Sequence, residues 1–445
     1  MLFKKIELWV LILIFLIFII FTIIFGALLR DYYLGGNRFP KIQKVATFVA
    51  SIPSNIAKYK ILTKGDTPPV LFKNKNKKKF ERFEENLNEK LLILPRYDGN
   101  LNRSVVEIIN LNDFKVLHTY QHNIDELNQS ITNTIEHKNI KTDQSKSRFV
   151  YLHPLILNDG SLISSHEYGP LFRIDFCSNI LWINQDENFH HSKEFAIDRD
   201  YFWVPIKTYP HSKYITEKNL NEFSDDAVAK VDISGNIIFT KSVSELLIEN
   251  NILYENDLFE EIDPIHLNDI QPVFETSNFM EKGDIFLSLR HQNSIVHYRP
   301  SNNTVINYIK GPFYVQHDVD IISGNEISIF NNNDNILENS KYSEILLYNL
   351  ETKKFKKKFN NSLVENNFKT KTQGISQILK DGSMLVEEQN HGRLIFFNKK
   401  GDKEWEFVNK DNNGNVYLLS WSRIIEDKKE IEKIKNIISN RKCQK

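Results

Sequence analysis

The stretch Asp263–Asn333 reads DPIHLNDIQPVFETSNFMEKGDIFLSLRHQNSIVHYRPSNNTVINYIKGPFYVQHDVDIISGNEISIFNNN. Short apolar runs alternate in it with polar turns, a pattern that predicts β-strands joined by tight connections. At the joins between the runs stand His266, Arg290, His291 and His317. Side chains at strand ends can meet around one axis, and imidazoles gathered with a guanidinium make an anion site that also holds a nucleophile or a proton donor.

Outward from this stretch, hairpin units repeat along the chain. Two long copies, Ser161–Trp182 and Ser383–Trp405, each follow an Asp-Gly pair. A shorter signature, in which an apolar strand ends in Asp or Asn before a polar turn, occurs at Asn110, Asp175, Asp232, Asn349 and Asn398, with Arg299 in the same place of a sixth copy. Asn and Asp suit this position because their side chains close turns. Six copies predict an all-β fold, a six-bladed β-propeller. A β-sandwich is the alternative, but it gives no reason for this spacing.

The repeats divide the chain into four expected parts. These are a cytoplasmic tip and transmembrane anchor (1–30), a polar and helical juxtamembrane stalk (31–90), the propeller (91–423) and a C-terminal helix packed on its outside (424–445). The charged run Lys73–Lys90 is interpreted as a solvated helix or loop, because its basic and acidic halves cancel. Ser242–Leu253 has a helical period and is expected to form an insertion beside the site.

The apolar run Leu8–Leu29 is interrupted only by Thr22 and Gly26. It is long enough to cross roughly 30 Å of hydrocarbon. Lys4 and Lys5 precede it, so the positive-inside rule places the N-terminus in the cytoplasm and the remaining chain in the periplasm, anchored to the inner membrane. A cleaved signal peptide is the alternative. The run is longer than the apolar core of such peptides and no clear cleavage motif follows it, which favours a retained anchor.

Composition narrows the possible partners and cofactors. The 57 basic Lys and Arg residues balance 57 Asp and Glu residues, so the charge gives no indication of a nucleic acid partner. The only cysteines, Cys177 and Cys443, make no disulfide framework; two unpaired thiols are favoured, although a bond is permitted outside the cytoplasm. No Cys-x-x-Cys pair or His/Cys ligand spacing occurs, so we expect neither a metal nor another cofactor.

Four runs of this sequence resemble the bacterial arylsulfotransferases that work without a nucleotide sulfate donor. They are FHHS (Phe189–Ser192), HLNDI (His266–Ile270), SLRHQNSI (Ser288–Ile295) and QHDVDIISGNEISIFNNN (Gln316–Asn333). The runs occur in the family's order, and the resemblance covers the chain from about Tyr151 to about Trp421. It implies transfer of a sulfuryl group from a small aryl sulfate to a phenol, in two steps through a sulfohistidine.

The resemblance also implies a role for each matched residue. His317 matches the nucleophile, while His266, Arg290 and His190 match the sulfate-binding and acid–base positions. His191 is the alternative to His190 and is kept as a substrate-binding candidate. Further candidates for the substrate pocket are Phe313 and Tyr314, which precede the nucleophile, and Tyr168, His391 and Arg393, which occupy equivalent hairpins of the two long repeats together with His166.

The other histidines are assigned to turns or to the surface: His118, His122, His137, His153, His211 and His297. His291 is expected to face away from its neighbour Arg290. Residues 31–90 do not resemble the N-terminal β-domain through which many periplasmic relatives dimerise, so the oligomeric state stays open. The rival function is a non-catalytic envelope propeller that binds or scaffolds other molecules, since propellers host many functions. A quinone-cofactor dehydrogenase is disfavoured because only Trp182 and Trp405 recur in the repeats.

Overall fold

The computed structural model describes residues 7–443 apart from short internal segments. The segments left out are 34–37, 64–68, 76, 86–88, 134–136, 138–139, 141–143, 198, 209–211, 215–222, 255–262 and 335–341, together with the side chains of 33, 54, 55 and 57–63. The chain divides into two compact units: one holds residues 1–66 and 253–264, and the other holds 67–252 and 265–445.

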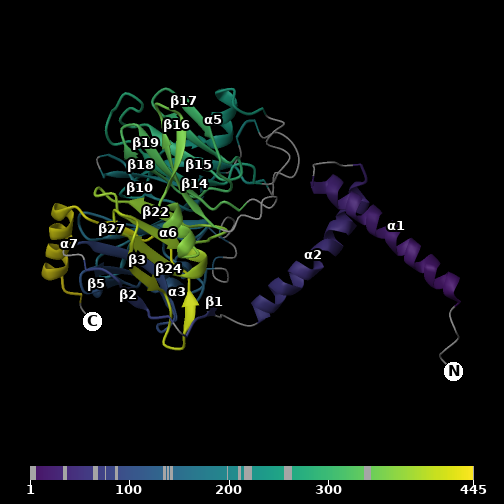
Figure 1. Ribbon diagram of the computed structural model, residues 1–445, viewed down its shortest axis with the longest axis horizontal. Helices are drawn as coiled ribbons and strands as arrows, with labels where there is room; N and C mark the ends of the chain where they lie inside the picture. The colour runs from purple at the N-terminus through teal and green to yellow at the C-terminus, as the bar shows by residue number, and fades with distance from the viewer. Residues whose placement is uncertain are drawn as a thin grey trace. The chain divides into compact units, whose positions relative to one another are not determined.

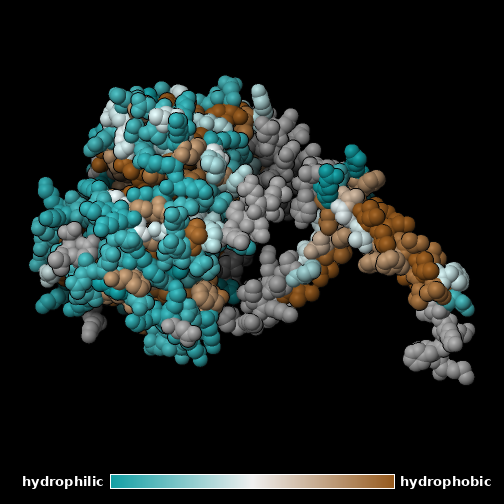
Figure 2. Space-filling model, viewed as in Figure 1, coloured by the Kyte–Doolittle hydropathy of each residue, from teal (hydrophilic) through white to brown (hydrophobic). Residues whose placement is uncertain are grey.

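Two helices dominate the first unit. Helix α1 (Leu8–Tyr33) is apolar along its length, with a mean hydropathy of 3.4, and none of this apolar segment is buried, as the brown surface in Figure 2 shows. It is long and apolar enough to cross a membrane, a property that a signal sequence shares. Helix α2 (Pro40–Thr63) confirms a helix in the expected stalk. Gln43 on α2 donates a 2.7 Å hydrogen bond to Asp31 on α1, which ties the two helices together.

The second unit is mostly β, with antiparallel sheets arranged like the blades of a propeller (Figure 1). Three sheets follow the order of their strands: β14 (Leu267–Pro272), β15 (Ile285–Leu289), β16 (Ser294–Arg299) and β17 (Thr304–Lys310); β18 (Val319–Ser323), β19 (Glu326–Asn331), β20 (Glu344–Asn349) and β21 (Lys354–Lys358); β22 (Ile375–Ile378), β23 (Met384–Glu388), β24 (Arg393–Phe397), β25 (Lys403–Val408) and, at its edge, β2 (Phe80–Arg82).

A fourth blade joins the two ends of the unit. It contains β27 (Arg423–Ile425), β3 (Leu91–Asp98), β4 (Arg103–Asn110) and β5 (Lys115–Tyr120). The late strand β27 pairs with the early strand β3 along three residues, so hydrogen bonds between strands close the ring. All eight residues of β3 are buried, as expected for a strand covered on both faces.

The remaining strands form one eight-stranded sheet and one two-stranded sheet. The large sheet contains β6 (Leu152–Ile156), β7 (Leu162–Ser165), β8 (Gly169–Ile174), β9 (Ile180–Phe189), β10 (Glu194–Phe195), β11 (Tyr201–Lys207), β12 (Asp226–Asp232) and β13 (Ile237–Ser242). The small sheet pairs β1 (Val70–Lys73) with β26 (Asn415–Tyr417). Short helices connect the strands: α3 (Ile124–Gln129), α5 (Val243–Glu249), α6 (Asn360–Glu365) and the 3₁₀ turn η2 (Gln389–His391). Helix α5 confirms the helical period of residues 242–253.

The repeated Asp or Asn signature marks the turn before the last strand of a blade. Each of these five side chains accepts a hydrogen bond from a backbone N–H two to four residues ahead, from Asn112, Asn179, Ser234, Thr352 or Lys400. The sixth copy works differently, because the Arg299 guanidinium binds the Asp284 carboxylate at 2.8 and 3.0 Å. The sequence prediction of a repeating, turn-closed hairpin is therefore confirmed.

Residues 67–90 depart from the expected polar stalk. Val70–Lys73 and Phe80–Arg82 are strands that extend the second unit, rather than a solvated helix or loop. Phe80 explains why, since its ring stacks on Phe114 at 3.9 Å and lies 6.1 Å from Trp405 in the core. Isolated aromatic anchors among many lysines carry little periodic signal, so the sequence pattern did not indicate them.

The C-terminal helix packs on the outer face of the second unit, as expected (Figure 1). Helix α7 (Lys428–Asn440) begins at Asp427, whose side chain caps the N–H of Glu430 at 2.9 Å. Ile431 and Ile434 on its inner face join the hydrophobic core beneath β3–β8. The helix thereby carries the end of the chain back toward the turn between β8 and β9.

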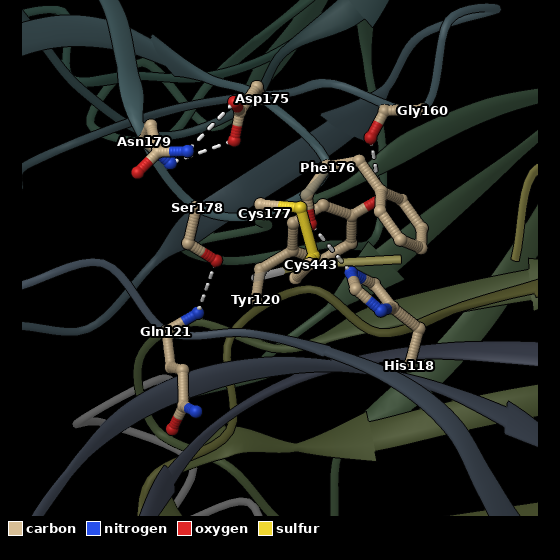
Figure 3. The surroundings of a disulfide bond; sticks show 10 residues. All are labelled: His118, Tyr120, Gln121, Gly160, Asp175, Phe176, Cys177, Ser178, Asn179 and Cys443. Atoms are coloured by element: carbon tan, nitrogen blue, oxygen red, sulfur yellow. Dashed lines mark hydrogen bonds between the residues drawn. A yellow bond between two sulfur atoms is a disulfide. The ribbon is translucent and has the colours of Figure 1, made fainter. Parts of the chain in front are cut away.

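Beyond α7, Cys443 forms a disulfide with Cys177 (Figure 3). The expectation of two unpaired thiols was wrong. The two residues are 266 positions apart in sequence, and only the return of the chain through α7 brings their Cα atoms to 5.3 Å. The β8–β9 turn that holds Cys177 is also fixed by Ser178, whose hydroxyl accepts a 3.0 Å hydrogen bond from the Gln121 N–H.

Replacing Cys443 by serine should lower the free energy of unfolding by about 2–4 kcal/mol, because the bond closes a very long loop in the unfolded chain. Urea unfolding followed by tryptophan fluorescence, with and without dithiothreitol, checks this. The reductant should destabilise the wild type and leave C443S unchanged. A wild type that is insensitive to the reductant would contradict the prediction.

Candidate active site

His317 lies just before β18, held by residues on both sides of it. Its backbone N–H donates to the Phe330 carbonyl at 2.9 Å. The Gln316 side chain donates to the carbonyls of Leu289 and Ser294, both at 2.9 Å, in the preceding blade. The Asp318 carboxylate accepts the Ser376 N–H at 2.9 Å in the following blade. The side chains of Gln316 and Asp318 thus bind the two neighbouring blades. The imidazole of His317 takes no part in these contacts.

The His317 ring is buried and lacks hydrogen bonds of standard geometry. The residue is 1 % exposed, and neither ring nitrogen makes a hydrogen bond of standard geometry to the described residues. Burial, together with the nearby charges of His266 and Arg290, lowers the pKa of His317 to about 3, and the backbone of Gly374 opposes this shift only in part. A neutral imidazole with a free lone pair is the reactive form for nucleophilic attack.

His191 and His190 form a contiguous pair next to His317. The His191 ring lies 5.6 Å from the His317 ring and 5.3 Å from the His266 ring, while the Nδ1 atoms of the pair are 2.7 Å apart. Burial and the neighbouring imidazoles hold the pKa of His191 well below its usual range. His190 is set back, with Nε2 3.2 Å from Asp226. Of the two, His191 therefore faces His317, and His190 stands behind it.

Asp226 fixes the residues around the His190–His191 pair. Its carboxylate binds Lys207 Nζ at 2.6 Å and accepts the backbone N–H of Leu267 at 2.7 Å. Burial alone would raise the pKa of Asp226, but Lys207 and His190 outweigh it and hold the pKa below its usual range. The bond to Leu267 also fixes the backbone next to His266, so one buried carboxylate positions histidines from two sheets.

His266, Arg290 and His291 stand at neighbouring ends of β14 and β15. The His266 carbonyl accepts the Arg290 N–H at 3.0 Å, and Arg290 Nη1 lies 2.7 Å from His291 Nε2. The rings of His266 and His291 are 4.5 Å apart. His291 was expected to face away, but the turn that follows β15 brings it to His266. The group places N–H donors and the positive charge of Arg290 at the edge of the buried cluster.

His153 and Trp421 complete the cluster, and both were missed by the sequence reasoning. His153 is 3 % exposed and stacks on Trp421 with ring centres 4.8 Å apart, while Trp421 lies 5.0 Å from His317. Burial, reinforced by Arg423, lowers the pKa of His153 to about 3, against the opposing effect of Glu194 at 3.0 Å. His153 was assigned to a turn or the surface; no motif around either residue indicated the site.

Backbone strain gathers around the same cluster. Five of its non-glycine residues have positive φ: His153 (+40°), Tyr168 (+52°), His191 (+48°), His266 (+51°) and Trp421 (+59°). Left-handed backbone at such residues costs of order 1–3 kcal/mol each and persists only where surrounding contacts enforce it. Strain of this kind is typical of sites where the direction of a side chain matters more than the stability of the backbone.

Tyr168 is the only remaining pocket candidate with a described contact to the cluster. Its ring stacks on His190 at 5.1 Å. Phe313 belongs instead to the hydrophobic core with Phe355, and Tyr314 is 38 % exposed. His391 and Arg393 line a separate surface pocket, where Arg393 pairs with Glu388. The equivalence of the two repeats failed here because only one of the two hairpins faces the cluster.

Most of the other histidines have structural partners. Three ring nitrogens hydrogen-bond to backbone carbonyls: His118 to Phe176, His122 to Ser178 and His137 to Gln185. Two more bond to side chains: His166 to Asn128 and His297 to the Asp284 carboxylate. His211 lies outside the described residues.

Comparison with known proteins agrees with the clustered histidines. The family described as "Arylsulfotransferase (ASST)" matches residues 153–410, more than half of the chain. The matched range contains every histidine of the cluster. The protein is therefore a propeller-like member of a sulfuryl-transferring class, and the chain belongs to the arylsulfotransferase family. No curated protein matches it.

Solved structures are similar only at a distance. A protein of unknown function from Bacteroides caccae shares 11 % identity over 76 % of this chain and 100 % of its own, with a TM-score of 0.47. TolB from Acinetobacter baumannii shares 9 % over 77 % and 68 %, with a TM-score of 0.44. Virginiamycin B lyase from Staphylococcus aureus shares 11 % over 75 % and 90 %, with a TM-score of 0.38. At these scores the likenesses carry no argument about function.

Substituting His317 by glutamine should raise stability at acid pH. The unfolded state binds a proton at this histidine below its ordinary pKa of about 6.5 and the folded state does not, so the wild type loses stability as the pH falls from 6.5 toward 3. Between pH 7.5 and pH 5, H317Q should gain about 2 kcal/mol relative to the wild type. Urea unfolding at both pH values measures this difference.

Some buried carboxyl groups have raised pKa values, and burial raises the pKa of Glu167 to about 7. Such groups make the folded protein more stable at acid pH. They are present in both the wild type and H317Q, so their effect cancels in the comparison. A gap between wild type and H317Q that does not change with pH would show that His317 binds its proton equally well in the folded and the unfolded protein, which contradicts a lowered pKa.

Proposed function

We propose that this protein transfers a sulfuryl group from an aryl sulfate ester to a phenolic acceptor, by a ping-pong mechanism with a sulfohistidine at His317. The observation that carries the proposal is the buried, neutral His317 ring, whose nitrogens lack standard hydrogen bonds to the described residues while His266 and Arg290 stand close enough to shift its pKa. A neutral imidazole nucleophile next to N–H donors and the positive charge of an arginine is what transfer of an anionic group requires.

In the first half-reaction, a ring nitrogen of His317 uses its lone pair to form a bond to sulfur. The bond between sulfur and the aryl oxygen breaks, and the electron pair leaves with the oxygen as a phenolate. We assign His266, in its protonated form, as the donor that returns a proton to this phenolate. A phenolate is a good leaving group, so no step of this scheme needs a metal ion or a nucleotide.

In the second half-reaction, the oxygen of an acceptor phenol attacks the sulfur of the sulfohistidine. The nitrogen–sulfur bond breaks, His317 regains its lone pair, and the phenol proton passes to His266. Both residues thereby return to their starting states, and the protons and electron pairs balance over the cycle. Two moderate barriers replace one high barrier, which is the general advantage of covalent catalysis.

The remaining residues of the cluster bind and orient. Charge in sulfuryl transfer, as in phosphoryl transfer, spreads over three peripheral oxygens, which Arg290 can grip with two N–H groups. His191 faces His317 at 5.6 Å, and His190 and Asp226 hold it there. We therefore assign the catalytic position implied for the FHHS run to His191, with His190 as its positioning residue. Tyr168 is assigned to the aryl ring of the substrate.

The rival function, a non-catalytic binding propeller, requires that these side chains do not converge. His191, His266 and His317 adjoin three different sheets, yet the His191 ring lies 5.3 Å from the His266 ring and 5.6 Å from the His317 ring. A scaffold has no need of a buried histidine without standard hydrogen bonds. The convergence thus supports the enzyme over the scaffold.

We further propose six blades for the propeller. The eight-stranded sheet contains two successive runs of four strands, β6–β9 and β10–β13. The pairing of β9 with β11 that joins them involves two residue pairs, against seven between β11 and β12 within one run. Two blades that touch at one edge would give this pattern. With the four separate blades they make six.

For localisation, we propose that α1 is retained as a single-pass anchor in the inner membrane, with the N-terminus in the cytoplasm and the catalytic unit in the periplasm. Lys4 and Lys5 before the apolar run support this direction. The Cys177–Cys443 disulfide supports it independently, because such bonds persist in oxidising compartments and are rare in the cytosol.

Replacing His317 by alanine should lower kcat/KM for 4-nitrophenyl sulfate, with phenol as acceptor, by about a thousandfold or more, because no other group stands in its place. Nitrophenol release measures the rate. Mass spectrometry of the acid-quenched wild type without phenol should detect one added sulfuryl group, which H317A lacks. The matched control is H118Q, whose imidazole lies outside the cluster against Phe176. Equal rates for H317A and the wild type would remove His317 from the mechanism.

Deleting residues 1–33 should move the protein from the membrane fraction to the soluble periplasmic fraction when a cleavable signal replaces them. The wild type should resist extraction with alkaline carbonate, and protease added to spheroplasts should digest its catalytic unit. Recovery of a shortened, soluble wild-type protein would show that α1 is a cleaved signal instead.

A further inference from the structure

Trp421 carries a buried donor that the described residues do not satisfy. The residue is 3 % exposed, and its indole Nε1 has no hydrogen-bond partner within the described part of the chain. An indole nitrogen can only donate, and a buried donor without a partner costs about as much as a lost hydrogen bond. One explanation for a buried donor without a protein partner is that a ligand accepts its hydrogen bond. The neighbouring His317 nitrogens are unsatisfied in the same way.

The position of Trp421 is fixed by a buried carboxylate at its backbone and by a ring stacked on its indole. Its backbone N–H donates to one oxygen of Glu387 at 2.8 Å, and the N–H of Ser422 donates to the other at 2.8 Å. Glu387 is fully buried on β23, and burial raises the pKa of its carboxyl to about 7 despite these two bonds. The indole also stacks on His153, which Glu194 holds at 3.0 Å.

Packing alone does not account for this arrangement. The described apolar cluster around Trp421 contains only Leu152 and Ile375, whereas the blade cores each bring together eight or more buried side chains. A residue that only filled space there would need neither a φ of +59° nor a carboxylate bound to its backbone. The strain is explained if the direction of the indole is what matters.

We propose that the Nε1–H of Trp421 donates a hydrogen bond to a peripheral oxygen of the sulfuryl group at His317. The inference rests on the proposed function and adds a substrate-binding residue to it. The Trp421 and His317 rings are 5.0 Å apart, which leaves the indole within reach of a tetrahedral group bonded to the imidazole. An indole adds a donor without adding charge, so it stabilises the oxygens and leaves His317 neutral.

The test compares Trp421→Phe with the wild type. Phenylalanine keeps most of the ring and removes the N–H. We expect kcat/KM for 4-nitrophenyl sulfate to fall by about a hundredfold, the usual effect of losing one oxyanion donor. Competitive inhibition by inorganic sulfate should weaken by about tenfold, since this anion offers the same oxygens without an aryl group. The matched control is Trp182→Phe, whose indole N–H already binds the Ile233 carbonyl at 3.1 Å away from the cluster; both values should stay as in the wild type.

A series of aryl sulfates with different leaving phenols separates binding from structural damage. Because the donor acts on peripheral oxygens, W421F should lower every rate by one factor and leave the dependence on the pKa of the leaving phenol unchanged. If W421F melts well below the wild type, benzothienylalanine placed at position 421 keeps the shape and replaces the N–H by sulfur, and the same criteria apply to it.

The outcomes distinguish the two proposals. Rates and sulfate inhibition within twofold of the wild type for W421F, together with an inactive H317A, would overturn the role of Trp421 and leave the sulfohistidine mechanism intact. An active H317A would overturn the mechanism itself, whatever W421F does. Loss of both activity and sulfate inhibition in W421F, with W182F unaffected, supports the donor.

Discussion

The pairing of β27 with β3 is the constraint on which the rest of this structure depends. Three residues near the end of the chain bond to the first strand of the ring, and an isolated bridge between Arg96 and Leu419 extends the contact. In a closed ring of blades the innermost strands face one axis, and the sheet edges that remain are the short outermost strands. Closure therefore brings Trp421, near the C-terminus, against His153, early in the large sheet. Without it, the cluster would lack one of its walls.

The histidine cluster contains several features that lower the stability of the folded protein. Several imidazoles are buried together in neutral form, five residues have left-handed backbone, and His317 and Trp421 keep polar atoms without standard partners. The neighbouring residues compensate: Gln316, Asp318, Asp226 and Glu387 each bind two groups or brace adjacent strands. Buried carboxylates and amides thus hold the surrounding backbone in place, while His317 and Trp421 lie next to each other with ring centres 5.0 Å apart. This division of labour is expected where electrostatic preorganisation does most of the catalytic work.

The sequence predicted the parts of the fold that depend on local chemistry. Asp175 and its equivalents close their turns because the Asx side chain reaches a backbone N–H nearby, and such a signal is visible residue by residue. The histidines found through the family's runs lie beside short strands that the local pattern also indicated, with His266 directly before β14 and His317 just before β18. The sequence did not indicate the contacts between residues that lie far apart along the chain. Nothing local joins Cys177 to Cys443, Phe80 to its core partners, or His153 to Trp421. Arg393 was misplaced because two similar hairpins occupy different surroundings.

The position of β27 after all the other described strands determines when the ring can close during synthesis. The strand β27 that closes the ring and the cysteine Cys443 both follow every other described strand in sequence, and Trp421 lies just before β27, so all three are synthesised after the other blades. Before these residues are made, β3 has no β27 to pair with and His317 has no Trp421 beside it. A polypeptide that stopped before Trp421 would retain most of its sheets and yet lack both the strand that closes the ring and the indole beside His317.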